Sequence, residues 1–118
     1  MKTDLANMTC RACAGGEAAL EREDLDRLLE ELGEGWEIVD GTHHLEKTYK
    51  WKDFQEALGF TNLVGEIAER ENHHPDILLS WGQVKLLLRT HKIDGLTESD
   101  FILAAKADQA HRDLTSGM

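Results

Sequence analysis

The sequence predicts an α+β domain in which a four-stranded antiparallel sheet is covered on one face by helices. Three observations predict this fold. Three segments carry apolar residues at helical spacing, the segments between them alternate apolar and polar residues, and the order along the chain is α-β-β-α-β-β-α. Consecutive strands joined by short turns favour antiparallel pairing, and amphipathic helices need an apolar sheet face to pack against.

The first helix is expected over residues 23–32. Its leucines recur at spacings of three and four residues, which places them on one face, and Gly33 and Gly35 follow as helix-ending residues. The leucines on this face are Leu25, Leu28, Leu29 and Leu32.

A β-hairpin is expected after this helix. Its strands cover residues 36–39 and 42–51, and Asp40-Gly41 between them is a strong signal for a two-residue turn. Alternation along the second strand predicts that one of its faces is apolar. The residues on that face are Leu45, Tyr49 and Trp51.

A long helix is expected over residues 52–72, and it stops because Pro75 cannot continue a helix. Proline also disfavours helical geometry at the residue before it, which is His74. Two strands follow, over residues 77–80 and 84–90, with a turn between them. One face of the later strand carries Val84, Leu86 and Leu88, and the other carries Lys85, Leu87, Arg89 and His91.

The last helix is expected to begin after Thr97, which is a good N-cap residue. Asp100 stands three residues further on, in the position that completes a capping box. The helical pattern continues through Asp108 before a polar tail.

Length and charge limit the classes of function. The chain has 118 residues and a formal net charge of −10, so it is one domain by length and its field repels nucleic-acid backbones. No apolar run would span a bilayer, and the N-terminus lacks a signal-peptide core, so we expect a cytoplasmic protein without membrane contact. We expect a flexible leader over residues 1–18, the domain over residues 19–113 and a polar tail over residues 114–118.

Two residue pairs with chemical potential lie apart from the predicted core. Cys10 and Cys13 have the spacing of half a zinc knuckle or of a redox pair, but no second CxxC completes a zinc site. We expect them in a reduced, partly ordered arm. His43 and His44 are neighbours in one strand and point to opposite faces, so we expect surface residues rather than a joint site.

The most informative stretch lies where the long helix ends. His73 is in the last turn, where the helix dipole favours an imidazolium, and Glu69 one turn earlier is placed to bond its ring. His74 leaves the helix, and His91 returns beside it if the last two strands pair. Three imidazoles in different environments suit the roles of proton donor and acceptor. A three-histidine metal site and a helix end without chemistry are the alternatives.

The spacing around these histidines resembles the signature of the pterin-4a-carbinolamine dehydratase family. The signature reads Glu-x-x-x-His-His-Pro, five residues, an aromatic residue, nine residues, His and then Asp. It is filled here by Glu69, His73, His74, Pro75, Trp81, His91 and Asp100. Further similar positions, within about residues 20–110, are Gly35-Trp36, Asp40-Gly41, Trp51-Lys52-Asp53-Phe54, Ala57-Leu58-Gly59-Phe60, Thr90-His91 and Gly95-Leu96-Thr97-Glu98.

The resemblance implies a hydro-lyase that dehydrates 4a-hydroxytetrahydropterin to the quinonoid dihydropterin without a metal or a cofactor. The reaction recycles the tetrahydropterin spent by aromatic amino-acid hydroxylases. His73, His74 and His91 are the implied acid/base residues. The implied substrate-binding residues are Glu69, Asn72, Trp81, Arg89, Thr90, Lys92 and Asp100. The sequence departs from some relatives at Asn72, where they carry Asp, and at Ile77, where an aromatic residue is frequent.

The resemblance also implies a homodimer or homotetramer, which in some members joins sheets edge to edge. Some homologues show little dehydratase activity, and some animal members act as dimerisation cofactors of a hepatocyte transcription factor. A non-enzymatic pterin-binding or assembly module of the same fold is therefore the alternative function. The acidic charge gives no reason to expect that transcription factor as a partner. The sequence does not identify the natural pterin, or which histidine is the acid.

Overall fold

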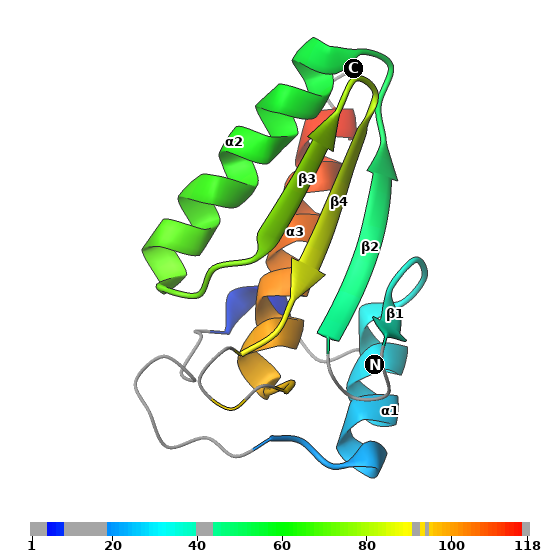
Figure 1. Cartoon of the computed structure of the whole chain (residues 1–118), viewed down its shortest axis with the longest axis vertical. Helices are drawn as coiled ribbons and strands as arrows, with labels where there is room; N and C mark the ends of the chain where they lie inside the picture. Colours follow the sequence, from blue (N-terminus) through cyan, green and yellow to red (C-terminus); the bar gives the residue numbers. More distant parts are fainter. Residues whose placement is uncertain (1–4, 9–18, 40–43, 91–92, 94, 117–118) are drawn as a thin grey trace.

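Three helices and four strands follow one another in the predicted order within the described part of the chain, after a short 3-10 helix. The structure is a computed structural model that describes residues 5–8, 19–39, 44–90, 93 and 95–116. The elements are η1 (Leu5–Asn7), α1 (Arg22–Leu32), β1 (Glu37–Val39), β2 (His44–Lys50), α2 (Phe54–Glu71), β3 (Asp76–Ser80), β4 (Gln83–Leu88) and α3 (Glu98–Ser116) (Figure 1). The predicted α+β fold is confirmed.

The four strands form one antiparallel sheet in the order β1-β2-β4-β3. β4 is central, because Leu86 lies opposite Lys47 of β2 on one side and Ile77 of β3 on the other. Figure 1 shows α3 behind the sheet and α2 alongside β3. The predicted apolar face is confirmed by its buried side chains, which are Leu45, Tyr49, Trp51, Val84, Leu86 and Leu88.

The predicted hairpin between β1 and β2 is described only in its strands. Asp40-Gly41 and His43 lie outside the described residues. His44 is half-buried, and its Nε2 lies 3.2 Å from Glu46 Oε2.

The end of α2 fixes how the chain enters the second hairpin. An Asp53 side-chain cap starts the helix, and Glu71 is its last residue. Asn72 then adopts a left-handed conformation, with φ 53°. The His73 N–H donates to the Ala68 carbonyl at 3.2 Å, which is the long-range bond of a Schellman cap. The chain therefore leaves the helical path before His73, and Pro75 keeps it from returning.

α3 begins with the capping box that the sequence predicts. The Thr97 backbone N–H donates to Asp100 Oδ2 at 2.9 Å. The helix continues to Ser116 and so includes residues that the sequence analysis assigns to a polar tail. Its inner face stays apolar well beyond Asp108, since Ala110 is buried and Leu114 packs against the core. None of the helices formed by described residues has the length and apolar character needed to cross a membrane.

Part of the predicted leader is built into the core. Leu5 is only 3% exposed and belongs to the hydrophobic cluster. Its turn is closed by a bond from the Met8 N–H to the Leu5 carbonyl at 3.0 Å. Cys10 and Cys13 lie outside the described residues.

A buried polar cluster joins the middle of α3 to the sheet. Asp108 accepts hydrogen bonds from the Trp36 indole at 2.9 Å, from Lys47 Nζ at 2.8 Å and from the Tyr49 hydroxyl at 2.5 Å. Gly35, with φ 96°, makes room for the lysine, because a Cβ there would lie 2.7 Å from Lys47 Cε. Burial, and then the Asp108 carboxylate, raises the pKa of Tyr49 well above its ordinary value. The phenol therefore keeps its proton and stays a donor.

Candidate active site

The end of α2 is joined to the start of α3 by a buried imidazole and a buried carboxylate. His73 is 3% exposed and Asp100 is fully buried. His73 Nε2 lies 2.7 Å from Asp100 Oδ1. Because an ionised carboxylate only accepts hydrogen bonds, Nε2 carries the proton in this contact. The aspartate therefore fixes both the orientation and the tautomer of the ring.

Both oxygens of Asp100 are occupied. Oδ2 accepts from the Thr90 hydroxyl and from the Thr97 backbone N–H, each at 2.9 Å. The Thr97 hydroxyl lies 2.9 Å from the Thr90 hydroxyl. Since the single Thr90 proton goes to Asp100, Thr97 is the donor in that last bond. Thr90 itself is fixed by its backbone bond to the Gly95 carbonyl at 2.8 Å. The carboxylate is thus held rigidly against His73.

His74 has the opposite environment. It is exposed, and its Nε2 lies 2.6 Å from Glu69 Oε2, which is also exposed. This corrects the expectation that Glu69 bonds the His73 ring. The left-handed Asn72 rotates the following residues off the helical path, so His73 turns towards α3 and His74 lies next to the glutamate. Two adjacent histidines therefore stand beside two different carboxylates.

The structure places the remaining predicted site residues as follows. Asn72 is exposed at the helix cap, and Arg89 is half-buried next to the buried Thr90. His91 and Lys92 lie outside the described residues. Trp81 is 71% exposed in the turn after β3. A five-residue strand, spanning roughly 17 Å, separates it from the histidines, so one chain does not bring Trp81 to His73.

Sequence reasoning missed the role of Thr97 as the hydrogen-bonding partner of Thr90. The signal was present, since Thr97 and Asp100 were expected to form a capping box, and the same carboxylate serves the cap and His73. Among the described residues no three His, Cys, Asp or Glu side chains gather into a group able to hold a metal ion.

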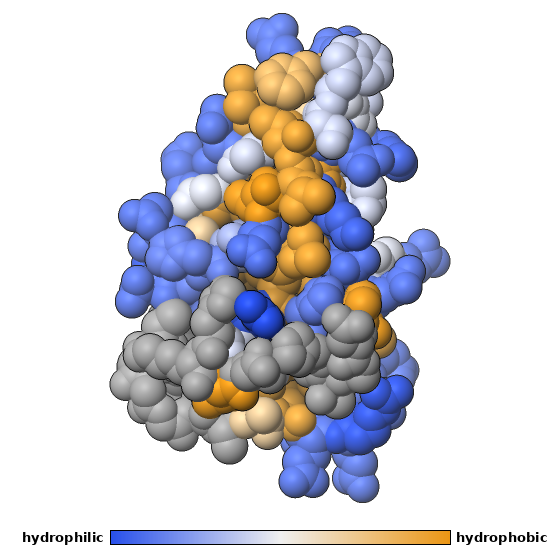
Figure 2. Space-filling view, viewed as in Figure 1, coloured by the Kyte–Doolittle hydropathy of each residue, from blue (hydrophilic) through white to orange (hydrophobic). Residues whose placement is uncertain are grey.

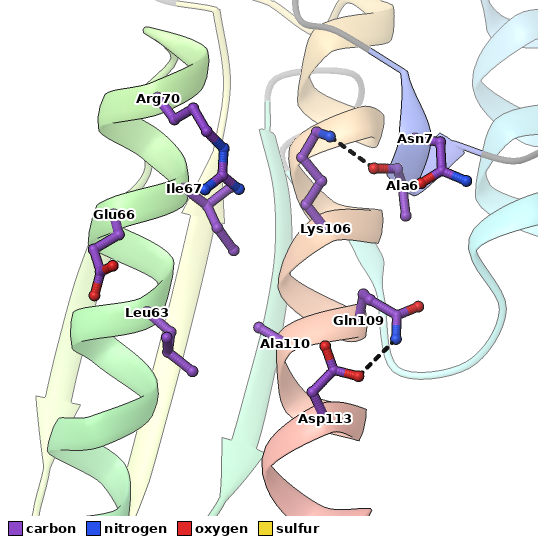
Figure 3. A pocket seen from close by; sticks show the side chains of 10 residues that line it. All are labelled: Ala6, Asn7, Leu63, Glu66, Ile67, Arg70, Lys106, Gln109, Ala110 and Asp113. Atoms are coloured by element: carbon purple, nitrogen blue, oxygen red, sulfur yellow. Dashed lines mark hydrogen bonds between the residues drawn. The ribbon is translucent and has the colours of Figure 1, made fainter.

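A cavity of about 450 Å³ lies between α2 and α3, away from the predicted site residues. Figure 3 shows Leu63 and Ile67 of α2 facing Ala110 of α3, with charged side chains above and below them. The residues that line it are Ala6, Asn7, Leu63, Glu66, Ile67, Arg70, Lys106, Gln109, Ala110 and Asp113. None of these was predicted as a site residue, and neither His73 nor His74 lines the cavity.

Fold and site together define the class of protein: a small α+β domain that holds a buried imidazole against a carboxylate at the junction of two helices. Residues 18–110 match the family described as pterin 4 alpha carbinolamine dehydratase, and the chain belongs to this family. A protein of Alkaliphilus metalliredigens is 50% identical over 106 residues, covering 90% of this chain and 95% of its own length. One of Rubrobacter xylanophilus is 51% identical over 107 residues, covering 91% and 98%. Both carry the provisional name pterin-4-alpha-carbinolamine dehydratase.

Solved structures show the same fold. A Brucella melitensis protein, described as a transcriptional coactivator/pterin dehydratase, matches with a TM-score of 0.73 at 33% sequence identity. The match covers 78% of this chain and 97% of that one. A pterin dehydratase-like protein described as a RuBisCO assembly factor of the alpha-carboxysome matches with a TM-score of 0.57 at 18% identity, covering 67% of this chain and 92% of that one. That second likeness concerns the fold alone.

Proposed function

We propose that this protein is a hydro-lyase that dehydrates a 4a-hydroxytetrahydropterin to the quinonoid dihydropterin. The observation that carries the proposal is the buried His73 ring held by Asp100, with a second histidine–carboxylate pair next to it in the chain. Membership of the dehydratase family and the names of relatives about half identical in sequence support the same reaction.

The reaction needs two proton movements. The bond from C4a to the hydroxyl oxygen breaks as an acid protonates that oxygen, which leaves as water. A base removes the proton from N5, and the N5–C4a double bond forms. An acid and a base that differ in environment suit this pair of steps. The acid gives up one proton and the base gains one, so a proton passing between them or through solvent restores the enzyme.

His73 is the better candidate for the acid in this proposal. Helical spacing predicts Glu69 as the partner of this ring, but the structure gives His73 a buried aspartate partner instead. Asp100 holds the ring in a fixed orientation and cannot move away from it, because both oxygens of the carboxylate are bonded. His74 and His91 are then the candidates for the base. Asp100 acts on the reaction by positioning His73.

Substrate binding is proposed for the polar residues around the histidines. Asn72, Glu69, Arg89 and Lys92 offer amide, carboxylate and cationic groups that match the donors and acceptors of a pterin ring. Thr90 is buried in the Asp100 network, so we propose that it helps to fix the site. Trp81 is not part of this set within one chain.

We also propose a homo-oligomer, a cytoplasmic location and a functional link to an aromatic amino-acid hydroxylase. β3 is an edge strand of the sheet, and Leu78 within it is 55% exposed. Figure 2 shows apolar side chains in a band along the face of the molecule over β3. Unpaired strand edges flanked by exposed apolar residues favour pairing with another strand. In such an assembly a second copy would be needed to bring Trp81 near a site.

The test is a stopped-flow measurement of the loss of 4a-hydroxypterin with and without the protein. We expect acceleration by the wild type, and a rate lowered by more than ~10²-fold in His73→Ala. His44→Ala is the matched control, because His44 also pairs with a carboxylate, at 3.2 Å, but on β2. Tight pterin binding without acceleration would replace this proposal with the non-enzymatic binding module.

A further inference from the structure

A second buried link joins the end of α2 to α3. Glu71, the last residue of the helix, places Oε2 3.7 Å from Lys106 Nζ. The two side chains are 10% and 13% exposed, so this pair is far more buried than an ordinary surface ion pair. The same ammonium group donates to the Ala6 carbonyl at 2.7 Å, which Figure 3 marks with a dashed line. One lysine thus touches α2 and η1 from α3.

The two links enclose the turn that sets the direction of His73. Glu71 precedes the left-handed Asn72 and is held by Lys106, while His73 follows it and is held by Asp100. Both anchors stand on α3, where Lys106 follows Asp100 by less than two turns. The backbone between Glu71 and His73 is therefore fixed to one rigid helix on both sides of its left-handed residue.

The N-terminal turn is part of this attachment. η1 lies outside the residues 18–110 that match the family, yet Leu5 is buried in the core. The Ala6 carbonyl is an acceptor for Lys106, and so it directs the ammonium group to the position where it meets Glu71. The burial of Leu5 holds η1 against the core, and the Ala6 carbonyl of η1 orients Lys106.

We propose that Lys106, oriented by η1, is a positioning residue for His73. Without the ammonium, the mostly buried Glu71 carboxylate would lose this ion pair, so the last turn of α2 would be held less firmly against α3. His73 is two residues away and would move with that turn. This inference rests on the proposed function, since its consequence for activity is the misplacement of an acid/base group.

The main test compares Lys106→Met with Lys52→Met. Methionine keeps most of the apolar stem of lysine and removes the charge. Lys52 is the matched control, because its Nζ also lies 3.7 Å from a carboxylate oxygen, that of Glu56. The Lys52 side chain differs in being 78% exposed and in lying at the other end of α2. We expect Lys106→Met to lower kcat by roughly ten- to a hundredfold with little change in KM, because small misplacements of reacting groups have effects of this size. Lys52→Met should match the wild type, and Lys106→Arg should recover most of the rate.

A second readout needs no substrate. The ring nitrogen and N–H proton resonances of His73 in NMR spectra report its bond to Asp100. We expect them to shift in Lys106→Met and to stay in place in Lys52→Met. If Lys106→Met does not fold, Leu5→Ala replaces it, since it loosens η1 and leaves the lysine; a smaller shift of the same resonances is expected.

Unchanged His73 resonances in a folded Lys106→Met or Leu5→Ala protein would overturn the positioning role, even if the melting temperature falls. If the wild type itself does not accelerate dehydration, the proposed function fails, while the NMR comparison still decides whether Lys106 positions His73.

Discussion

Two buried aspartates on α3 bind their partners in the same way but serve different kinds of network. Asp100 and Asp108 each accept hydrogen bonds through both oxygens, and they lie about two turns apart on the helix. Asp100 binds His73 and the Thr90 hydroxyl at the start of the helix. Asp108 lies in the middle of the helix. It binds Lys47 and Tyr49 of β2 and Trp36, the residue before β1.

The difference lies in what the partners can do near neutral pH. Trp36, Lys47 and Tyr49 all donate to Asp108, and burial keeps the proton on Tyr49 by raising its pKa. Histidine is the side-chain type that most often transfers protons in enzymes, so His73 is the partner suited to the acid/base role in the proposed reaction. A buried carboxylate therefore does not identify a site by itself; the chemistry of its partner does.

The largest expected effect is on the rate in Asp100→Asn. An amide carries no negative charge, and its NH2 group would face a donor on either side, the Nε2–H of His73 or the Thr97 N–H and Thr90 hydroxyl. We expect the dehydration rate to fall by ~10²-fold or more per folded molecule, measured by stopped flow with circular dichroism as the check of folding. A rate within about threefold of the wild type would place Asp100 among structural residues, with Asp108.

The second effect is on stability in Asp108→Ala. The change leaves the mostly buried Lys47 ammonium without its carboxylate, so we expect a loss of about 3 kcal/mol in the free energy of unfolding by urea titration. Tyr49→Phe removes one hydrogen bond and should cost about 1 kcal/mol. Activity per folded molecule should be retained in both variants. A large loss of kcat in Tyr49→Phe would show that the two clusters are coupled.

The smallest effect concerns pH and the region around Tyr49. Burial, and then the Lys47 cation, lowers the pKa of His111, whose ring packs against Tyr49 with centroids 5.1 Å apart. A lowered pKa in the folded state means that the unfolded chain binds more protons, so stability is lost as pH falls below the ordinary histidine value. We expect the urea midpoint to fall less between pH ~7.5 and ~5 in His111→Gln than in the wild type. Equal falls would remove His111 from the pH response.

The fold could be predicted because its elements follow simple periods. The apolar face of β4 and the stop before Pro75 both come from rules that need only neighbouring residues. The capping box at Thr97 and Asp100 is equally local and is confirmed. The helix ended at Glu71 because Asn72 took up the left-handed conformation, which Asn does more readily than most residues.

The partners within the site depend on tertiary structure. Helical spacing predicted that Glu69 bonds His73. The left-handed turn at Asn72 lies between the two residues, and as a result Glu69 bonds His74 instead. Asp100 was implied only through the family resemblance, because its contact with His73 joins two helices far apart in the sequence. Asp108 gave no signal, since a single acid on a helix is usually solvated, and only the packed sheet brings Lys47 and Tyr49 to it.

The placement of both clusters on one uninterrupted helix has a consequence for how the molecule opens. α3 cannot loosen near Asp108 without removing the support beneath Asp100, and it cannot fray at its first turn without breaking the His73 bond. Its central amides should therefore exchange with solvent only when the whole domain unfolds, as one cooperative unit. The proton-exchanging ring would then be protected by the global stability of the domain rather than by a separately folding loop.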